Sequence, residues 1–250
     1  MGSEMCIRDR YKLEKQDWST GATAEGDASL AGAEFDLYYL GDGTDSNVSI
    51  KLDKDGDGLG EGTEYLPSDT TPIDHVTVGE DGTYTSSATY LGYGKYKVVE
   101  TKSPEGYLLT SYDAALISKE FFVSDDTVTV EVPVANYPFL GSFKIQKNDI
   151  DYDTRSQGDT NLQATFEIIN KSNADVLVDV NGDGVLDKDS ERFAPNAKIT
   201  DFTTDENGYY ETASDFLPYG TYQINETVPP VGYTQDGTIT KTFEVRNEDE

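Results

Sequence analysis

The 250-residue sequence has little cysteine, tryptophan, methionine or positive charge: one Cys, one Trp, two Met, and 19 Lys and Arg against 48 Asp and Glu. Its single Cys6 excludes an internal disulfide. The net charge of −29 excludes nucleic acid as a default partner and disfavours anionic membrane surfaces, because binding either needs clustered basic residues. No apolar run approaches the roughly 18 to 20 residues of a membrane span, so we expect no direct membrane insertion. Cations are the partners that this charge favours.

What the sequence does contain is enough apolar and aromatic material for a core. It has 17 Tyr, 10 Phe and 36% hydrophobic residues, too many for a disordered acidic tail. Apolar residues alternate with polar ones at period two, and Gly, Asp, Asn and Pro separate these runs. We therefore predict an all-β chain, with strands over residues 33–40, 96–100, 120–123, 128–134, 165–169, 222–226 and 242–245.

One block of sequence occurs twice. YGKYKVVETKSPEGY at residues 93–107 matches YGTYQINETVPPVGY at 219–233, and the acidic loops beginning at Asp53 and Asp179 keep the same spacing. Such self-similarity indicates tandem copies of one unit. About seven strands per copy predict a β-sandwich of the immunoglobulin-like kind in each.

The repeat sets the expected domain boundaries. We expect residues 1–10 to be a non-native or disordered leader, because they show no strand period and no match elsewhere in the chain. The first domain then covers residues 11–138 and the second 139–250. KTFEV at 241–245 aligns with KEFFV at 119–123, and nothing after it corresponds to TVTVEVPVANYP at 127–138. The second domain is therefore expected to be truncated, without its last strand.

Three motifs in a fixed order resemble a known family. LAGAEF at 30–35, the repeated Gly-x-Tyr-x-x-x-Glu-Thr-x-x-Pro-x-Gly-Tyr block and PVANYP at 133–138 are similar to the Cna B-type domains of Gram-positive surface adhesins and pilins, also called SpaA-like or prealbumin-like. The resemblance implies a non-enzymatic stalk module of an extracellular, cell-wall-attached protein. Its implied partners are neighbouring modules of the same surface protein and a host matrix protein or glycan. The alternative is a carbohydrate- or protein-binding β-sandwich module of a secreted multidomain protein, with tyrosines forming the ligand face.

Many members of that family carry an autocatalytic isopeptide bond between a Lys and an Asn or Asp, promoted by a Glu. The resemblance implies Lys12 as nucleophile, Glu100 as acid and Asn136 as acceptor in the first copy. Desolvation would turn a buried lysine into a neutral nucleophile, and a carboxylic acid held neutral could polarise the carboxamide and shuttle protons. In the second copy the matching residues are Lys144 and Glu226.

Two of these assignments have competitors. Strand alternation places Lys15 rather than Lys12 on the face that carries the apolar side chains, and Lys147 competes with Lys144 in the same way. Asn247 is the one acceptor that the second copy offers; without it Lys144 stays unreacted, and the open sheet edge could accept a strand from another chain. The alternative for the lysines and for Glu100 is that they are ordinary solvated strand residues. The alternative for Asn136 is that it forms a turn at the end of a strand.

Both acidic loops match a calcium-loop pattern. DKDGDGLGEGTE at 53–64 and DVNGDGVLDKD at 179–189 alternate carboxylate or amide side chains around a glycine bend, as Ca²⁺ ligation requires. No helices flank them, which argues against an EF-hand, and ordinary Asp-Gly turns are the alternative. In the first loop the predicted ligands are the side chains of Asp53, Asp55, Asp57 and Glu61 or Glu64 with the Leu59 carbonyl. In the second they are the side chains of Asp179, Asn181, Asp183 and Asp187 with the Val185 carbonyl, and Asp189 or Glu191 is a further candidate.

Overall fold

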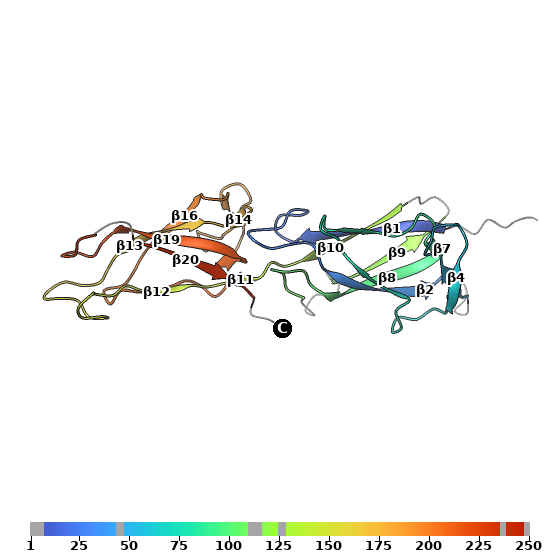
Figure 1. Cartoon of the computed structure of the whole chain (residues 1–250), viewed down its shortest axis with the longest axis horizontal. Helices are drawn as coiled ribbons and strands as arrows, with labels where there is room; N and C mark the ends of the chain where they lie inside the picture. Colours follow the sequence, from blue (N-terminus) through green and yellow to red (C-terminus); the bar gives the residue numbers. More distant parts are fainter. Residues whose placement is uncertain (1–7, 44–47, 110–116, 125–128, 236–238, 248–250) are drawn as a thin grey trace, which may run out of the picture. The chain divides into compact units, whose positions relative to one another are not determined.

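The chain folds into two compact units. The computed structural model describes residues 8–43, 48–109, 117–124, 129–235 and 239–247. Unit 1 consists of Met1–Thr23 and Ser29–Tyr137, and unit 2 of Ala24–Ala28 and Pro138–Glu250. Strands dominate both units (Figure 1). No helix in the described part of the chain is long and apolar enough to cross a membrane.

Ten strands of the described residues belong to unit 1, and the long strands β1, β2 and β8 alternate between buried and less buried residues as predicted. They are β1 (Arg8–Asp17), β2 (Glu34–Gly41), β3 (Ile50–Leu52), β4 (Glu61–Tyr65), β5 (Asp74–Thr77), β6 (Thr83–Thr85), β7 (Leu91–Gly92), β8 (Gly94–Lys102), β9 (Ser118–Val123) and β10 (Thr129–Asn136). Two sheets form the sandwich, one in the order β5-β2-β8-β9 and one in the order β10-β1-β6, with β7 pairing the start of β1. The hairpin β3-β4 carries the first acidic loop.

The core of unit 1 is built from both sheets. Tyr11 and Leu13 of β1 and Val132 of β10 belong to the same buried cluster as Phe35 of β2 and Tyr96 of β8. Because side chains of a strand alternate between its two faces, β1, β2 and β8 each send every second residue into this layer. The all-β sandwich predicted from period-two alternation is confirmed.

Unit 2 repeats this arrangement with one difference. Its strands are β11 (Leu140–Gly141), β12 (Lys144–Gln146), β13 (Thr165–Asn170), β14 (Val176–Leu177), β15 (Arg192–Phe193), β16 (Lys198–Thr203), β17 (Tyr209–Glu211), β18 (Leu217–Pro218), β19 (Gly220–Val228) and β20 (Thr240–Val245). The sheet β16-β13-β19-β20 corresponds to β5-β2-β8-β9, and β12 pairs with β17 as β1 pairs with β6. Among the described residues, no strand of unit 2 takes the place that β10 has beside β1.

The start of β1 differs from the expected leader over residues 1–10. Arg8 and Asp9 pair with Gly92 and Leu91 of β7, and the Arg8 guanidinium donates a hydrogen bond to the Lys51 carbonyl at 3.1 Å. These residues show no apolar alternation, and backbone pairing and this hydrogen bond hold them in the sheet. The remaining residues of the expected leader, 1–7, lie outside the described residues.

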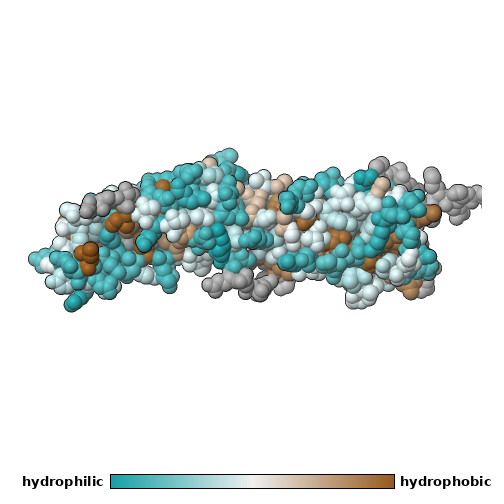
Figure 2. Space-filling model, in the orientation of Figure 1, coloured by the Kyte–Doolittle hydropathy of each residue, from teal (hydrophilic) through white to brown (hydrophobic). Residues whose placement is uncertain are grey.

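The visible face of both units is mostly hydrophilic (Figure 2). This agrees with the net charge of −29 and with the low mean hydropathy of −0.58. Polar side chains occupy the outward positions of the strands, while the aromatic residues lie largely inside.

Candidate functional site

Three polar residues meet in the interior of unit 1, each from a different strand. Lys15 of β1, Glu100 of β8 and Asn136 at the end of β10 are 1%, 2% and 2% exposed. The parallel pairing of β1 with β10 aligns Lys15 with Val134 and Asp17 with Asn136, so the asparagine lies just beyond the lysine. The opposite sheet supplies the glutamate.

The polar contacts leave reactive atoms free of hydrogen bonds. The Lys15 ammonium donates to the Val134 carbonyl at 3.1 Å and lies 3.6 Å from Oε1 of Glu100. The Asn136 amide nitrogen donates to the Leu108 carbonyl at 2.8 Å. Both carboxylate oxygens of Glu100 and Oδ1 of Asn136 are buried without a hydrogen bond among the described residues. Buried polar atoms without hydrogen-bond partners are rare in native proteins, which makes this cluster a candidate functional site.

Burial shifts both ionisable groups of this cluster towards their neutral forms. Desolvation raises the pKa of Glu100 to about 7, against the opposing effects of the Lys15 charge and the Asn136 carboxamide. Desolvation likewise lowers the pKa of Lys15 to about 8, although Glu100 acts to raise it. A neutral amine and a neutral carboxylic acid are therefore both accessible near neutral pH.

The assignment of the nucleophile to Lys12 is corrected by this geometry. Lys12 lies on the outer, partly exposed face of β1, where its neighbours across the ladders are Glu131 and Thr85. Lys15 has the opposite parity and points into the core beside Glu100. Strand alternation predicted that Lys15 faces the apolar interior, and the structure confirms this parity, while Lys12, the residue that the resemblance implied, lies outside the cluster.

A buried hydrogen-bond pair next to the cluster escaped the sequence analysis. Asp17 accepts hydrogen bonds from the backbone amides of Ser19 and Thr20 at 2.6 and 2.9 Å and from the Tyr107 hydroxyl at 2.7 Å. In unit 2 the Tyr233 hydroxyl donates to Asp149 at the same 2.7 Å. The aspartate and the tyrosine recur at matching positions of the two copies, and this recurrence could have indicated the pair.

The corresponding cluster in unit 2 is incomplete. The Lys147 ammonium lies 3.0 Å from Oε1 of Glu226 and donates to Oε2 at 3.3 Å. Lys144 is exposed on the other face of β12 and does not approach Glu226. The correction from Lys12 to Lys15 thus applies equally to Lys144 and Lys147. The Lys147 side chain is 17% exposed, whereas that of Lys15 is 0% exposed.

The structure places the competing acceptor Asn247 far from this lysine. Strand β20 runs antiparallel to β19, with Val245 opposite Gly220 and Thr240 opposite Asn225. Glu226 therefore lies beside the start of β20, and Asn247 follows its end. Gly220 and Glu226 are six positions apart along β19, which is roughly 20 Å at the usual rise. Because Asn247 lies near Gly220 and Lys147 lies beside Glu226, Asn247 cannot reach Lys147.

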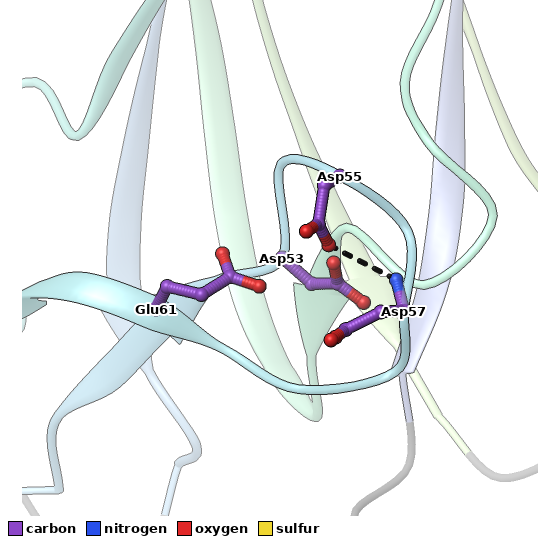
Figure 3. Close-up of side chains that lie close together, drawn as sticks. All are labelled: Asp53, Asp55, Asp57 and Glu61. Atoms are coloured by element: carbon purple, nitrogen blue, oxygen red, sulfur yellow. Dashed lines mark hydrogen bonds between the residues drawn. The ribbon is translucent and has the colours of Figure 1, made fainter.

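Four carboxylates converge in the first acidic loop (Figure 3). Oxygens of Asp53, Asp55, Asp57 and Glu61 all lie within 4.8 Å of one another. Asp53 is fully buried and accepts hydrogen bonds from the Gly56 and Gly58 amides, both at 2.7 Å. Although burial acts to raise its pKa, a hydrogen bond from Thr89 and the two amide bonds hold the pKa of Asp53 below the usual value.

The other predicted ligands of this loop behave differently. Glu64 lies 3.6 Å from the Lys51 ammonium and is absent from the four-carboxylate cluster. The sequence offered Glu61 or Glu64 as the last carboxylate ligand of this loop, and the structure favours Glu61. Leu59 exposes its side chain, and its amide donates to Asp57 at 2.8 Å.

The second acidic loop has the same turn geometry without the convergence. Asp179 accepts hydrogen bonds from the Gly182 and Gly184 amides at 2.7 and 2.8 Å, and Asn181 and Asp183 accept from the amides two residues on. The buried Glu191 is a fourth acceptor in this loop, and it accepts hydrogen bonds from the amides of Val180, Asn181 and Asp187. Within the described residues, only the first loop brings three or more acidic side chains this close together.

Comparison with known proteins agrees with the fold and the doubled arrangement. The model of the SpaA prealbumin-like fold domain matches residues 11–138 and again residues 141–250. The chain belongs to the SpaA prealbumin-like domain family. No curated protein sequence matches it.

Solved structures of SpaA-type and related surface proteins cover almost all of the chain. The Bacillus anthracis TIE protein aligns over 98% of this chain and 32% of its own, with 20% identity and a TM-score of 0.52. The shaft pilin SpaA from Lactobacillus rhamnosus GG aligns over 97% of this chain and 95% of its own, with 17% identity and a TM-score of 0.32. The chain thus spans about a third of the TIE protein and about 60% of a streptococcal ancillary pilin. The likeness to the TIE protein supports the shared prealbumin-like fold.

Proposed function

We propose that this chain is a structural stalk module of a bacterial surface or pilus protein, and that Lys15 and Asn136 of unit 1 join in an isopeptide bond. The observation that carries the proposal is the buried cluster of Lys15, Glu100 and Asn136. A lysine, a carboxylic acid and a carboxamide, drawn from three strands and sealed from water, have no evident purpose in a core unless they react. Pilus subunits and adhesins of the same surface assembly are the expected partners.

The proposed reaction is an amide exchange that occurs once per molecule. The neutral Lys15 amine attacks Cγ of Asn136, while protonated Glu100 hydrogen-bonds to Oδ1 and polarises the carbonyl. Glu100 then relays a proton from the lysine nitrogen to the amide nitrogen of Asn136. The Cγ–Nδ2 bond breaks, ammonia leaves, and a new Nζ–Cγ bond remains. No oxidant or cofactor is consumed, and the product is a crosslink rather than a released substrate.

The bond would tie β1 directly to β10 at the end of unit 1. These strands are parallel neighbours, with Asp17 opposite Asn136. A pulling force entering through one strand and leaving through the other would pass through a covalent link instead of the hydrogen-bond ladder. This property suits a stalk at the extracellular surface, where a single cysteine offers no disulfide.

The placement of the tyrosines favours the stalk over the ligand-binding alternative. A carbohydrate- or protein-binding face would present aromatic rings to solvent. Five tyrosines are instead among the largest fully buried side chains: Tyr11, Tyr39, Tyr96, Tyr107 and Tyr222. Although Tyr93, Tyr137, Tyr152 and Tyr209 are exposed, the largest fully buried side chains of the two cores are tyrosines.

Intact mass tests the isopeptide bond directly. The wild-type chain should be lighter than its sequence mass by about 17 Da, the mass of one ammonia. Lys15→Ala should show the full mass expected for its sequence, whereas Lys12→Ala should retain the loss, because Lys12 lies on the outer face. A wild-type mass equal to the sequence mass would rule the bond out and leave only the fold.

We also propose that the four-carboxylate cluster of the first loop binds Ca²⁺. Hard carboxylate oxygens around a glycine-rich turn suit this ion, and extracellular millimolar calcium would saturate even a weak site. The cluster of Asp53, Asp55, Asp57 and Glu61 supports this proposal, and the second loop is the weaker candidate. Isothermal titration with CaCl₂ should detect heat with wild type and lose it with Asp55→Asn combined with Asp57→Asn.

A further inference from the structure

Three chain segments of unit 1 are joined by hydrogen bonds around Asn136. They are the end of β1, the end of β10 and the turn that follows β8. The Trp18 amide donates to the Asn136 carbonyl at 2.9 Å, which joins the ends of β1 and β10. The Tyr107 hydroxyl donates to Asp17 at 2.7 Å, which joins the turn to the end of β1.

Leu108 joins the turn to the end of β10 through both of its backbone groups. Its amide donates to the Tyr137 carbonyl at 3.0 Å, and its carbonyl accepts a hydrogen bond from Nδ2 of Asn136 at 2.8 Å. A carbonyl oxygen can only accept, so this bond fixes which end of the carboxamide faces Leu108. In this orientation Oδ1 is buried without a hydrogen bond among the described residues, and Oδ1 is the atom that Glu100 must reach in the proposed exchange.

Tyr107 holds the neighbouring Leu108 in place. Tyr107 and Asp17 are each 1% exposed, and Asp17 lies opposite Asn136 in the ladder between β1 and β10. A hydrogen bond to a carboxylate is stronger than one between neutral groups. The bond from Tyr107 to Asp17 therefore anchors the turn to the pair of strands that the isopeptide bond would join.

One repeated block of sequence supplies both the acid and this tyrosine. Glu100 lies in β8, and the chain turns after it at Gly106, where a φ of 85° favours glycine. The turn is closed by a hydrogen bond from the Tyr107 amide to the Pro104 carbonyl at 3.2 Å. A single strand and turn thus bring the acid and the tyrosine to the surroundings of Asn136.

We propose that Asp17 and Tyr107 are positioning residues of the amide exchange, which hold the Leu108 carbonyl where it keeps Nδ2 of Asn136 in the leaving-group position. This inference rests on the isopeptide bond proposed for unit 1. When Nδ2 receives the proton that Glu100 relays, it gains positive charge, which a carbonyl acceptor stabilises. The Cγ–Nδ2 bond then breaks and ammonia leaves. Asp17 and Tyr107 act through Leu108 and exchange no proton.

The rate of ammonia loss tests this role. The full chain is made in a short pulse of cell-free synthesis and held at pH 6, which slows the exchange because the pKa of Lys15 is about 8. Samples are quenched in acid and their intact mass is measured. Tyr107→Phe should reach the same final mass loss as wild type about tenfold or more slowly, because small displacements of positioned groups cost large factors in rate. Asp17→Ala removes the acceptor of the same hydrogen bond and should be equally slow.

Two other tyrosines provide matched controls. Tyr96→Phe also removes a buried hydroxyl of unit 1, which donates to the Gly92 carbonyl at 2.8 Å. Tyr96 lies four positions from Glu100 along β8, or roughly 13 Å at the usual rise, so this variant should react at the wild-type rate. Tyr233→Phe removes the matching hydroxyl of unit 2 and should change neither the extent nor the rate of ammonia loss.

A change of acceptor separates positioning from general stability. Asn136→Asp places a carboxylic acid at this position, whose proton can sit on either oxygen, so a rotation of 180° presents the same group to Lys15. With this acceptor the new Nζ–Cγ bond releases water, about 18 Da by stoichiometry, instead of ammonia. Adding Tyr107→Phe should therefore slow the acid acceptor much less than the amide acceptor, as a double-mutant cycle would show. A general loss of stability would slow both acceptors alike.

Two results would overturn this inference and leave the isopeptide bond standing. One is ammonia loss from Tyr107→Phe as fast as from Tyr96→Phe. The other is equal slowing of the amide and acid acceptors by Tyr107→Phe. A wild-type chain that never loses ammonia would overturn the isopeptide bond itself, and this inference with it. The first two results are differences in rate and the third is a difference in final mass, so the two failures are distinguishable.

Discussion

The two units share a fold, a lysine and a glutamate, but only unit 1 seals them from water. Lys15 and Glu100 both have fully buried side chains, while Lys147 beside the equally buried Glu226 remains 17% exposed. The difference follows the strand that lies over the lysine, since β10 covers Lys15 and contributes Asn136. The difference in burial therefore comes from the covering strand, because both units have the lysine and the glutamate.

The largest effect expected to separate the units comes from the isopeptide bond proposed for unit 1. Glu100→Gln should leave unit 1 unreacted, with the ammonia retained, and lower its free energy of unfolding by about 4 to 5 kcal/mol, the loop-closure entropy expected for a link spanning more than 100 residues. Chemical denaturation followed by Trp18 fluorescence reports on unit 1 alone, because Trp18 is the single tryptophan.

The matched control is Glu226→Gln in unit 2. It removes the same group from a cluster with no acceptor within reach among the described residues, so the mass should change only by the substitution itself. A loss of ammonia that depends on Glu226 would contradict the contrast drawn between the two units.

The next effect concerns the tyrosine that binds a buried aspartate in each unit. Tyr107→Phe removes a hydrogen bond to Asp17 and should cost unit 1 about 1.5 to 3 kcal/mol, the range for hydrogen bonds to charged groups. Tyr233→Phe should cost unit 2 less, because Tyr233 is half-buried and water can replace its hydroxyl. Equal losses in calorimetric unfolding of the two variants would show that burial does not distinguish these pairs.

Calcium should stabilise unit 1 more than unit 2, and we expect this difference to be smaller than the preceding ones. At a concentration ten times the dissociation constant, a ligand of the folded state adds about 1.4 kcal/mol, so the melting temperature of unit 1 should rise with calcium and fall again with chelator. Asp57→Asn should abolish the rise, and Glu64→Gln should preserve it, because Glu64 lies outside the cluster. A larger response from unit 2 would reverse the proposed order of the loops.

Local patterns in the sequence were sufficient for much of this architecture. Alternation predicted the strands and the inward parity of Lys15, and the spacing of Asp53, Asp55 and Asp57 predicted their convergence, since turns bring near neighbours together. The resemblance to a family placed the lysine at Lys12, three residues too early, because lysines recur along β1 and only the parity tells them apart.

Contacts between distant residues could not be read in this way. The hydrogen bond from Tyr107 to Asp17 joins positions 90 residues apart, so the pattern around either residue does not predict its partner. Which groups are desolvated depends on how two sheets pack, and alternation within one strand carries no information about the opposing sheet.

The smallest expected contrast is the response of the two buried aspartates to acid. Hydrogen bonds, first that from Tyr233, lower the pKa of Asp149 to about 2 from an unfolded value of 3.8, so its contribution to stability is present above pH 4 and is lost as the pH falls towards 2. Desolvation raises the pKa of Asp17, so its charged form is penalised in the folded state and acidification relieves that penalty.

Calorimetry of Asp149→Asn and Asp17→Asn between pH 5 and 2 compares each variant with wild type at the same pH, which cancels the titration of all other groups. The deficit of Asp149→Asn should shrink on acidification and that of Asp17→Asn should not. Parallel pH profiles for the two variants would mean that the aspartates share one environment despite their opposite pKa shifts.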